Sequence, residues 1–143
     1  MGSVTVIEEL PVDADRAWKL VREFDNLALY EGVVDELVLH DADGRIERTV
    51  RIGGVTLRQR LESRDDAARE LRIHTIDGGG ILQRLEAQLS VTESGTDSCV
   101  MMWEAEYEPM IDDRQMKPLI RDFYLTAIAL FRRHLGDQPG EPQ

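Results

Sequence analysis

The chain has 143 residues, which suits a single domain, and 42% of them are apolar and 31% charged. The formal net charge of -11 argues against nucleic acid and anionic membrane surfaces as partners, since both repel an acidic protein. The single cysteine, Cys99, excludes an internal disulfide and a cysteine-based zinc site.

The N-terminal region has no basic segment followed by an apolar run, so we predict no signal peptide. No window holds about 18 apolar residues, the length that a membrane-spanning helix needs. A cytoplasmic location is therefore the default expectation.

The first elements are a strand and two helices. Residues 3–12 alternate and contain β-branched side chains, which predicts a strand. A helix is predicted over 12–26, because Asp13 can cap it and an apolar stripe follows. That stripe consists of Ala17, Leu20, Val21 and Phe24. Residues 27–34 predict a short second helix or turn.

Six more strands are predicted in succession. Turn signals such as Gly53-Gly54 and the DGGG run at 77–80 separate them. Connections this tight require an antiparallel meander. The six ranges are 35–40, 45–52, 55–64, 69–77, 83–93 and 98–108.

A long helix is predicted over 112–135, with its regular part starting near Lys117 because Pro118 lies early in it. Gly136 is a suitable stop, and residues 137–143 form a polar tail that we predict to be disordered. One face of the helix is apolar. Its members are Ile120, Phe123, Ala127, Leu130, Phe131 and His134, widened by Tyr124, Ile128 and Leu135.

These elements predict an α+β fold. A seven-stranded antiparallel sheet wraps around the long C-terminal helix, with two short helices after the first strand and one domain over 1–136. Only the last helix is long enough to cover the apolar face of the sheet. A strongly curved sheet around one helix leaves a space that is either side-chain core or a pocket.

Two polar residues share the inward face of the hairpin at 48–61. By strand parity, Arg48 and Gln59 point to the same side as the apolar residues of that hairpin. A lone arginine in a solid core would carry a large desolvation penalty. This favours a pocket in which Arg48 donates to a ligand carbonyl, phenolate or carboxylate. The alternatives are a bulge that shifts the parity, or an Arg48 side chain that snorkels to solvent.

The last strand predicts an aromatic wall. Met101, Trp103, Ala105 and Tyr107 alternate with polar residues and should face inward. Small Ala105 between two aromatic residues leaves room for a flat ligand. Pure core packing on the C-terminal helix explains the same pattern equally well. The three histidines are scattered, and none is spaced for metal binding with another histidine or a carboxylate, so we predict no metal site.

Four segments together resemble a known family. They are AWKLVREFDNLALY after the first strand, RLESRDDAARELRIHTIDG in the middle, LEAQLSVTESGTDSCVMMWEAEYEP late in the chain, and FYLTAIALFRRHL at the end. In order and spacing they resemble the polyketide cyclase/dehydrase branch of the START-like, helix-grip (SRPBCC) superfamily, which also contains the birch pollen allergen.

The resemblance implies a deep, mostly apolar cavity between the sheet and the last helix, open near the short helices and loops, with no cofactor. The Phe123-Tyr124 pair matches a pair found in relatives. Relatives tend to carry tryptophan where Tyr30 stands. They also tend to carry an inward glutamate where Gln59 stands, opposite an inward arginine that matches Arg48.

Two functions are consistent with these residues and with the resemblance. As a cyclase or aromatase, the protein would fold a polyketide-like chain by proximity, with Arg48 stabilising enolate charge. Tyr124 or Tyr107 would exchange a proton, with Glu31 as the weaker choice. As a carrier, it would hold a lipophilic metabolite without chemistry. The expected ligand-binding residues are Tyr30, Glu31, Gln59, Trp103, Ala105, Phe123 and Ala127. A regulatory partner at the acidic surface is a third hypothesis, and a homodimer stays open.

Overall fold

The computed structural model describes residues 2–24, 34–40, 45–52 and 54–136. The strands and helices that follow one another along the chain are β1 (Gly2–Leu10), α1 (Ala14–Val21), β2 (Val34–His40), β3 (Arg45–Ile52), β4 (Val55–Asp65), β5 (Glu70–Asp77), β6 (Leu82–Gly95), β7 (Ser98–Pro109) and α2 (Asp113–Gly136).

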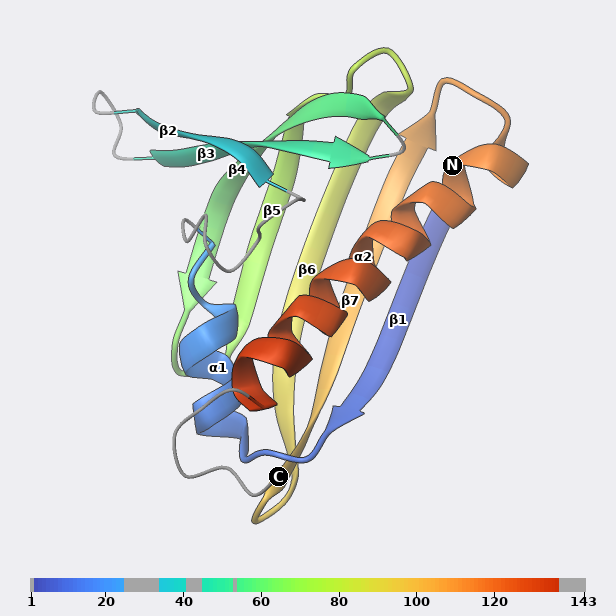
Figure 1. Cartoon of the computed structure of the whole chain (residues 1–143). Coiled ribbons are helices and arrows are strands. Elements are labelled where there is room, and N and C mark those ends of the chain that lie inside the picture. Colours follow the sequence, from blue (N-terminus) through green and yellow to red (C-terminus); the bar gives the residue numbers. More distant parts are fainter. Residues whose placement is uncertain (1, 25–33, 41–44, 53, 137–143) are drawn as a thin grey trace.

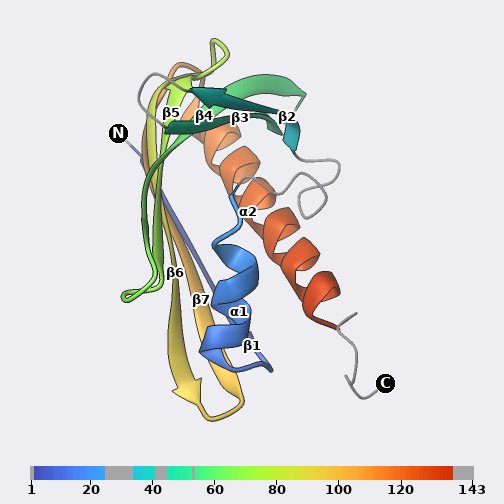
Figure 2. The same ribbon diagram turned by 90° about the vertical axis from the view of Figure 1, so that its left-hand side faces the viewer.

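The strands form one antiparallel sheet in the order β1-β7-β6-β5-β4-β3-β2. The six strands β2 to β7 pair in succession as a meander, and β1 joins the far side of β7. Both helices lie on the same face of the sheet, and β2, β3 and β4 bend over the first half of α2 (Figures 1 and 2). The bent sheet therefore borders the space beside its inner face on two sides.

Local chemistry explains where the elements begin and turn. The Asp13 carboxylate accepts a hydrogen bond from the Arg16 backbone N–H at 3.1 Å, which caps α1 as predicted. Gly54 has a φ of 82°, the left-handed conformation that a two-residue hairpin turn requires, and it joins β3 to β4. Such a turn fixes the register of the hairpin that carries Arg48 and Gln59.

The start of α2 differs from the prediction. The helix begins at Asp113 and not near Lys117, and it contains Pro118. Asp112 precedes it and accepts hydrogen bonds from the backbone of Gln115 and Met116 through its carbonyl. Because Pro118 lies close to this end, the proline removes a single backbone hydrogen bond from the ladder without breaking the helix.

The core lies between the sheet and the two helices. Met101, Trp103, Ala105 and Tyr107 of β7 are all buried, so the predicted inward set is confirmed. Phe123, Tyr124 and Phe131 of α2 pack around the Trp103 ring. No helix in the part of the chain that the structure describes is long and apolar enough to cross a membrane.

The α+β class, the antiparallel sheet and the long C-terminal helix are confirmed. The helix predicted over 12–26 is shorter, since α1 ends at Val21. The predicted second short helix at 27–34 lies, apart from its last residue, outside the described residues. The tail at 137–143 lies wholly outside them.

Candidate functional site

Arg48 and Gln59 lie inside the protein. Arg48 has an exposed fraction of 0% and Gln59 of 4%, so the alternative in which Arg48 snorkels to solvent is wrong. The two residues stand directly opposite each other on β3 and β4. The pairing of β4 with β5 does shift register between Arg58 and Gln59, but Gln59 still faces inward.

Among the described contacts, Gln59 and Phe24 hold the Arg48 guanidinium. Its Nε donates to Gln59 Oε1 at 2.9 Å, and one Nη donates to the Phe24 carbonyl at 3.1 Å. The guanidinium carbon lies 4.0 Å from the centroid of the Phe24 ring, a cation–π contact. These contacts fix the position of the cation, so a ligand would meet donors that are already oriented.

The C-terminal end of α1 brings Phe24 to this position. The Asp66 carboxylate, in the turn after β4, accepts hydrogen bonds from the Trp18 indole N–H at 2.9 Å and from Arg22 Nε at 2.8 Å. Arg64 of β4 donates to the Arg22 carbonyl at 2.8 Å. Since Phe24 follows Arg22 by two residues, these bonds also locate the carbonyl that Arg48 uses.

Thr75 extends the polar row on the inner face. It is buried and stands opposite Gln59 on β5. The inner side of the sheet therefore carries an arginine, an amide and a hydroxyl residue side by side on three neighbouring strands.

Trp103 and Tyr124 form the aromatic part of the site. Their rings stack with centroids 4.4 Å apart and an interplanar angle of 16°. Phe123 and Phe131 pack against the Trp103 ring with centroids at 6.3 Å. The indole N–H of Trp103 and the hydroxyl of Tyr124 are buried, and no described residue forms a hydrogen bond with either.

The Tyr124 hydroxyl is held in its neutral form. Burial raises its pKa far above the ordinary value for tyrosine, and the nearby positive charge of Arg48 opposes that rise only in part. Arg48 therefore lies within electrostatic reach of Tyr124, and Tyr124 keeps its proton at neutral pH. It can donate a hydrogen bond, but it is a poor base.

Tyr107 has a different environment. Its hydroxyl donates to the Asp113 carboxylate at the start of α2. Burial, followed by this bond to Asp113, raises the pKa of Tyr107. Tyr107 thus connects β7 to α2, and its proton is already committed to a carboxylate.

The remaining predicted ligand-binding residues divide into two groups. Ala105, Phe123 and Ala127 are buried between sheet and helix, and Ala105 stands opposite Ala87, so two small side chains lie side by side on β7 and β6. Tyr30 and Glu31 lie outside the described residues.

Sequence reasoning missed the roles of Phe24, Asp66 and Thr75. Phe24 was assigned to the apolar stripe of its helix, and no sequence signal shows that its carbonyl meets an arginine 24 residues later. Asp66 lies in the charged run 62–70, a pattern typical of a solvated turn, and nothing in that run indicates its bonds to Trp18 and Arg22. For Thr75 a signal existed, because it alternates with Ile73 on the inward side of β5.

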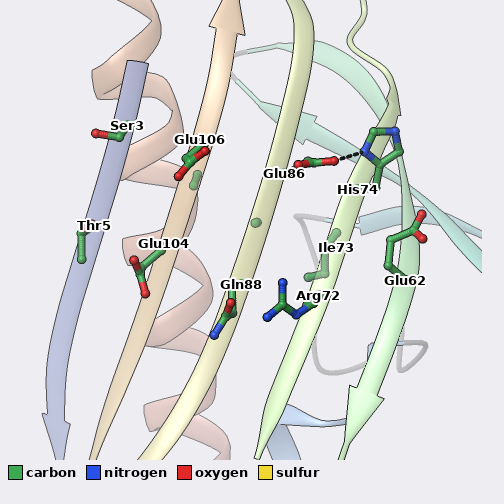
Figure 3. Close-up of a pocket in the computed structure, with 12 residues that line it drawn as sticks. Ser3, Thr5, Glu62, Arg72, Ile73, His74, Glu86, Gln88, Glu104 and Glu106 are labelled. Carbon is green, nitrogen blue, oxygen red and sulfur yellow. Dashed lines mark ion pairs between the residues drawn. The ribbon is translucent and has the colours of Figure 1, made fainter. Parts of the chain in front are cut away.

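The opposite face of the sheet carries a hollow of about 510 Å³. Figure 3 views this face, with α2 behind the strands, and shows His74 pointing toward Glu86, with which it forms an ion pair at 3.5 Å. His74 therefore lies on the outer face of the sheet. The polar residues that line the hollow are Ser3, Thr5, Glu62, Arg72, His74, Glu86, Gln88, Glu104 and Glu106. Within the described ranges, no three His, Cys, Asp or Glu side chains gather as metal ligands.

Comparison with known protein families shows which family the chain belongs to. Residues 1–136 match the family described as polyketide cyclase / dehydrase and lipid transport. The chain belongs to this family. The resemblance to helix-grip, START-like proteins is thereby confirmed, and it covers nearly the whole chain. None of the curated proteins compared with the chain matches it.

Solved structures share the fold of this family at low sequence identity. The protein XoxI from Bacillus cereus is 16% identical with a TM-score of 0.82, and the match covers 96% of this chain and 97% of that one. Norcoclaurine synthase from Thalictrum flavum, in complex with dopamine and hydroxybenzaldehyde, is 20% identical with a TM-score of 0.73 and coverage of 96% and 88%. The aromatase/cyclase Zhui from Streptomyces sp. R1128 is 11% identical with a TM-score of 0.70 and coverage of 92% and 89%.

Proposed function

We propose that the space between the sheet and α2 binds a small, largely apolar molecule, aromatic or polyketide-like, and that Arg48 is its polar anchor. The observation that carries this proposal is a fully buried guanidinium held in place by Gln59 and Phe24. Burying such a cation has a high desolvation cost, and its preorganised donors suit a carbonyl, phenolate or carboxylate. The family and its aromatase/cyclase neighbour support the same class of ligand.

As an enzyme, the protein would act as a cyclase or aromatase. The walls would hold a flexible poly-β-ketone in a reactive conformation, and Arg48 would stabilise the negative charge of an enolate. Tyr124, which stays protonated, would donate to a developing alkoxide. Tyr107 is the weaker candidate for this step because its hydroxyl already donates to Asp113.

As a carrier, the protein would bind the same class of molecule without chemistry. One observation favours this second function. The residue opposite Arg48 is Gln59, an uncharged amide that cannot act as a base, where relatives tend to carry a glutamate.

Arg48→Gln tests the proposal. Naphthoate, a planar aromatic carboxylate, is the binding probe, and aromatisation of a short poly-β-ketone thioester, followed by absorbance, reports turnover. We expect naphthoate affinity to fall roughly 10- to 100-fold, as loss of a charge-assisted hydrogen bond implies. Arg72→Gln makes the same change on the outer face and should leave the affinity unchanged.

The outcomes separate the functions. If wild type turns the thioester over and Arg48→Gln does not, although it still binds the uncharged thioester, the enzyme is supported. Loss of affinity with no turnover in either protein supports the carrier. Equal naphthoate affinity in wild type and Arg48→Gln would contradict the proposed anchor.

A further inference from the structure

Two of the buried polar groups lie close together in the ring cluster between β7 and α2. The Trp103 indole N–H and the Tyr124 hydroxyl have no hydrogen bond to any residue that the structure describes. Their residues are 1% and 2% exposed. More than nine in ten buried polar groups in proteins are hydrogen-bonded, so an unpaired pair within one cluster is unusual.

The two groups belong to one ring stack built from different elements. Trp103 projects from β7 and Tyr124 from α2, with ring centroids 4.4 Å apart. Both sequence neighbours of Trp103, Met102 and Glu104, lie on the other face of the sheet by strand parity, so the indole points to the helix side. The stack therefore presents its polar groups inside the layer that holds the proposed ligand.

We propose that the Trp103 N–H and the Tyr124 O–H form a donor pair that binds an oxygen acceptor on the ligand, as a second anchoring point beside Arg48. This inference rests on the proposed function and deepens it by naming a chemical class. An indole N–H can donate and cannot accept, so its partner must carry a lone pair. A ketone, quinone or phenolate oxygen fulfils this condition, and an ammonium group does not.

The elevated pKa of Tyr124 agrees with this role, because a neutral phenol donates where a phenolate would only accept. The apolar surroundings strengthen the effect. Phe123 and Phe131 flank the Trp103 ring, and a hydrogen bond formed among them does not compete with bulk water. The site should therefore prefer an oxygenated aromatic molecule over a hydrocarbon of the same shape.

Fluorenone and fluorene test this preference, since they have the same ring skeleton and differ in a ketone oxygen. We expect fluorenone to bind roughly fivefold to tenfold more tightly, the ratio that one or two neutral hydrogen bonds give. The ammonium form of 9-aminofluorene has no lone pair on its nitrogen and should bind no better than fluorene.

The indole resonances give a direct readout. The chain has two tryptophans, so a 15N-labelled sample shows two indole N–H signals, and Trp18→Phe assigns them. Fluorenone should move the Trp103 N–H signal downfield, as a new hydrogen bond does. The Trp18 N–H already donates to Asp66, and its signal should stay in place as an internal control. Fluorene should move neither signal downfield.

Tyr124→Phe removes one of the two donors and keeps the ring. We expect the preference for fluorenone to fall by at least half, while the ligand-free protein melts at a higher temperature because a buried unpaired hydroxyl is gone. Ser90→Ala is the matched control. It removes another buried hydroxyl, on the outer side of β6, and should leave the preference unchanged.

Each result has a defined meaning. Equal affinity for fluorenone and fluorene, with an unmoved Trp103 signal, overturns the donor pair while leaving the proposed binding function intact. Failure of both compounds and of naphthoate to bind overturns the binding function and the donor pair together. A lower melting temperature for Tyr124→Phe would show that the hydroxyl already has a partner, which also contradicts the inference.

Discussion

The residue at position 59 affects the charge that the neighbouring Arg48 guanidinium presents. The amide of Gln59 accepts a hydrogen bond from Arg48 without neutralising it, because an amide oxygen carries no formal charge. A glutamate at the same position would form a buried ion pair with the guanidinium. The residue at position 59 therefore contributes to the positive charge that the proposed ligand would meet.

Gln59→Glu should weaken the binding of naphthoate by about tenfold, because the new carboxylate competes with the ligand for Arg48. Isothermal titration calorimetry measures the affinity. Gln88→Glu, on the outer face of β6, adds the same charge and serves as control. Unchanged affinity in Gln59→Glu would show that naphthoate does not sit at Arg48.

The site was only partly predictable at this scale. Strand parity placed Arg48, Gln59, Trp103 and Ala105 inside, because alternation along a strand is a local property. The sequence did not predict the stack of Trp103 on Tyr124, or the Phe24 carbonyl on Arg48. Those contacts depend on how α1 and α2 lie across the sheet, which is decided by side chains distant in sequence.

At the scale of elements, α1 shows the same contrast between local features, which the sequence predicts, and long-range contacts, which it does not. Capping by Asp13 and the apolar stripe are local signals, and both were read correctly. The end of the helix was predicted too late. It lies at Val21, where Arg64 binds the Arg22 carbonyl and Asp66 holds the Arg22 side chain. Arg64 of β4 and Asp66 in the following turn, both more than 40 residues away, hold this end, so no local pattern reveals it.

Asp66 should make the docking of α1 dependent on pH. The hydrogen bond from Arg22, followed by that from Trp18, lowers the pKa of Asp66 below its ordinary 3.8. A carboxyl whose pKa is lower in the folded state stabilises the fold above pH 3.8, and this stabilisation is lost as the pH falls through the folded value. Protonation at low pH should therefore loosen α1.

Asp66→Asn tests this dependence. We expect a lower melting temperature than wild type at pH 7 and a difference that shrinks as the pH falls through the lowered folded-state pKa of Asp66, below which both side chains are neutral. Asp97→Asn, in the exposed turn between β6 and β7, is the control and should show no such convergence. A difference between Asp66→Asn and wild type that is independent of pH would contradict the role of the charge.

For the whole molecule, the position of α2 matters most, because it covers the inner face of the sheet and forms one wall of the proposed site (Figure 2). Both ends of the helix are fastened. Tyr107 bonds Asp113 at the start, and near the end Arg132 bonds the Glu8 carboxylate at 3.0 Å. A helix held at both ends keeps the distance between Tyr124 and the sheet constant, which an oriented donor requires.

Tyr107 of β7 and Tyr124 of α2 are both buried. We expect substitution by phenylalanine to change the free energy of unfolding in opposite directions at these two positions. In Tyr107→Phe, the Asp113 carboxylate loses a donor, so we expect the free energy of unfolding to fall by about 1–2 kcal/mol. In Tyr124→Phe, an unpaired hydroxyl disappears, and the free energy of unfolding should rise. Urea denaturation of both variants and of wild type measures the two changes.

A double-mutant cycle makes the first half of this prediction specific. Once Asp113→Ala has removed the acceptor, Tyr107→Phe should have little further effect on stability, since the bond is already absent. Tyr124→Phe should add its effect in full to Asp113→Ala, because no bond joins those two residues among the described contacts. Equal losses of stability in Tyr107→Phe and Tyr124→Phe would mean that both hydroxyls are bonded in the free protein. In that case α2 would be held by the very group that we assign to the ligand.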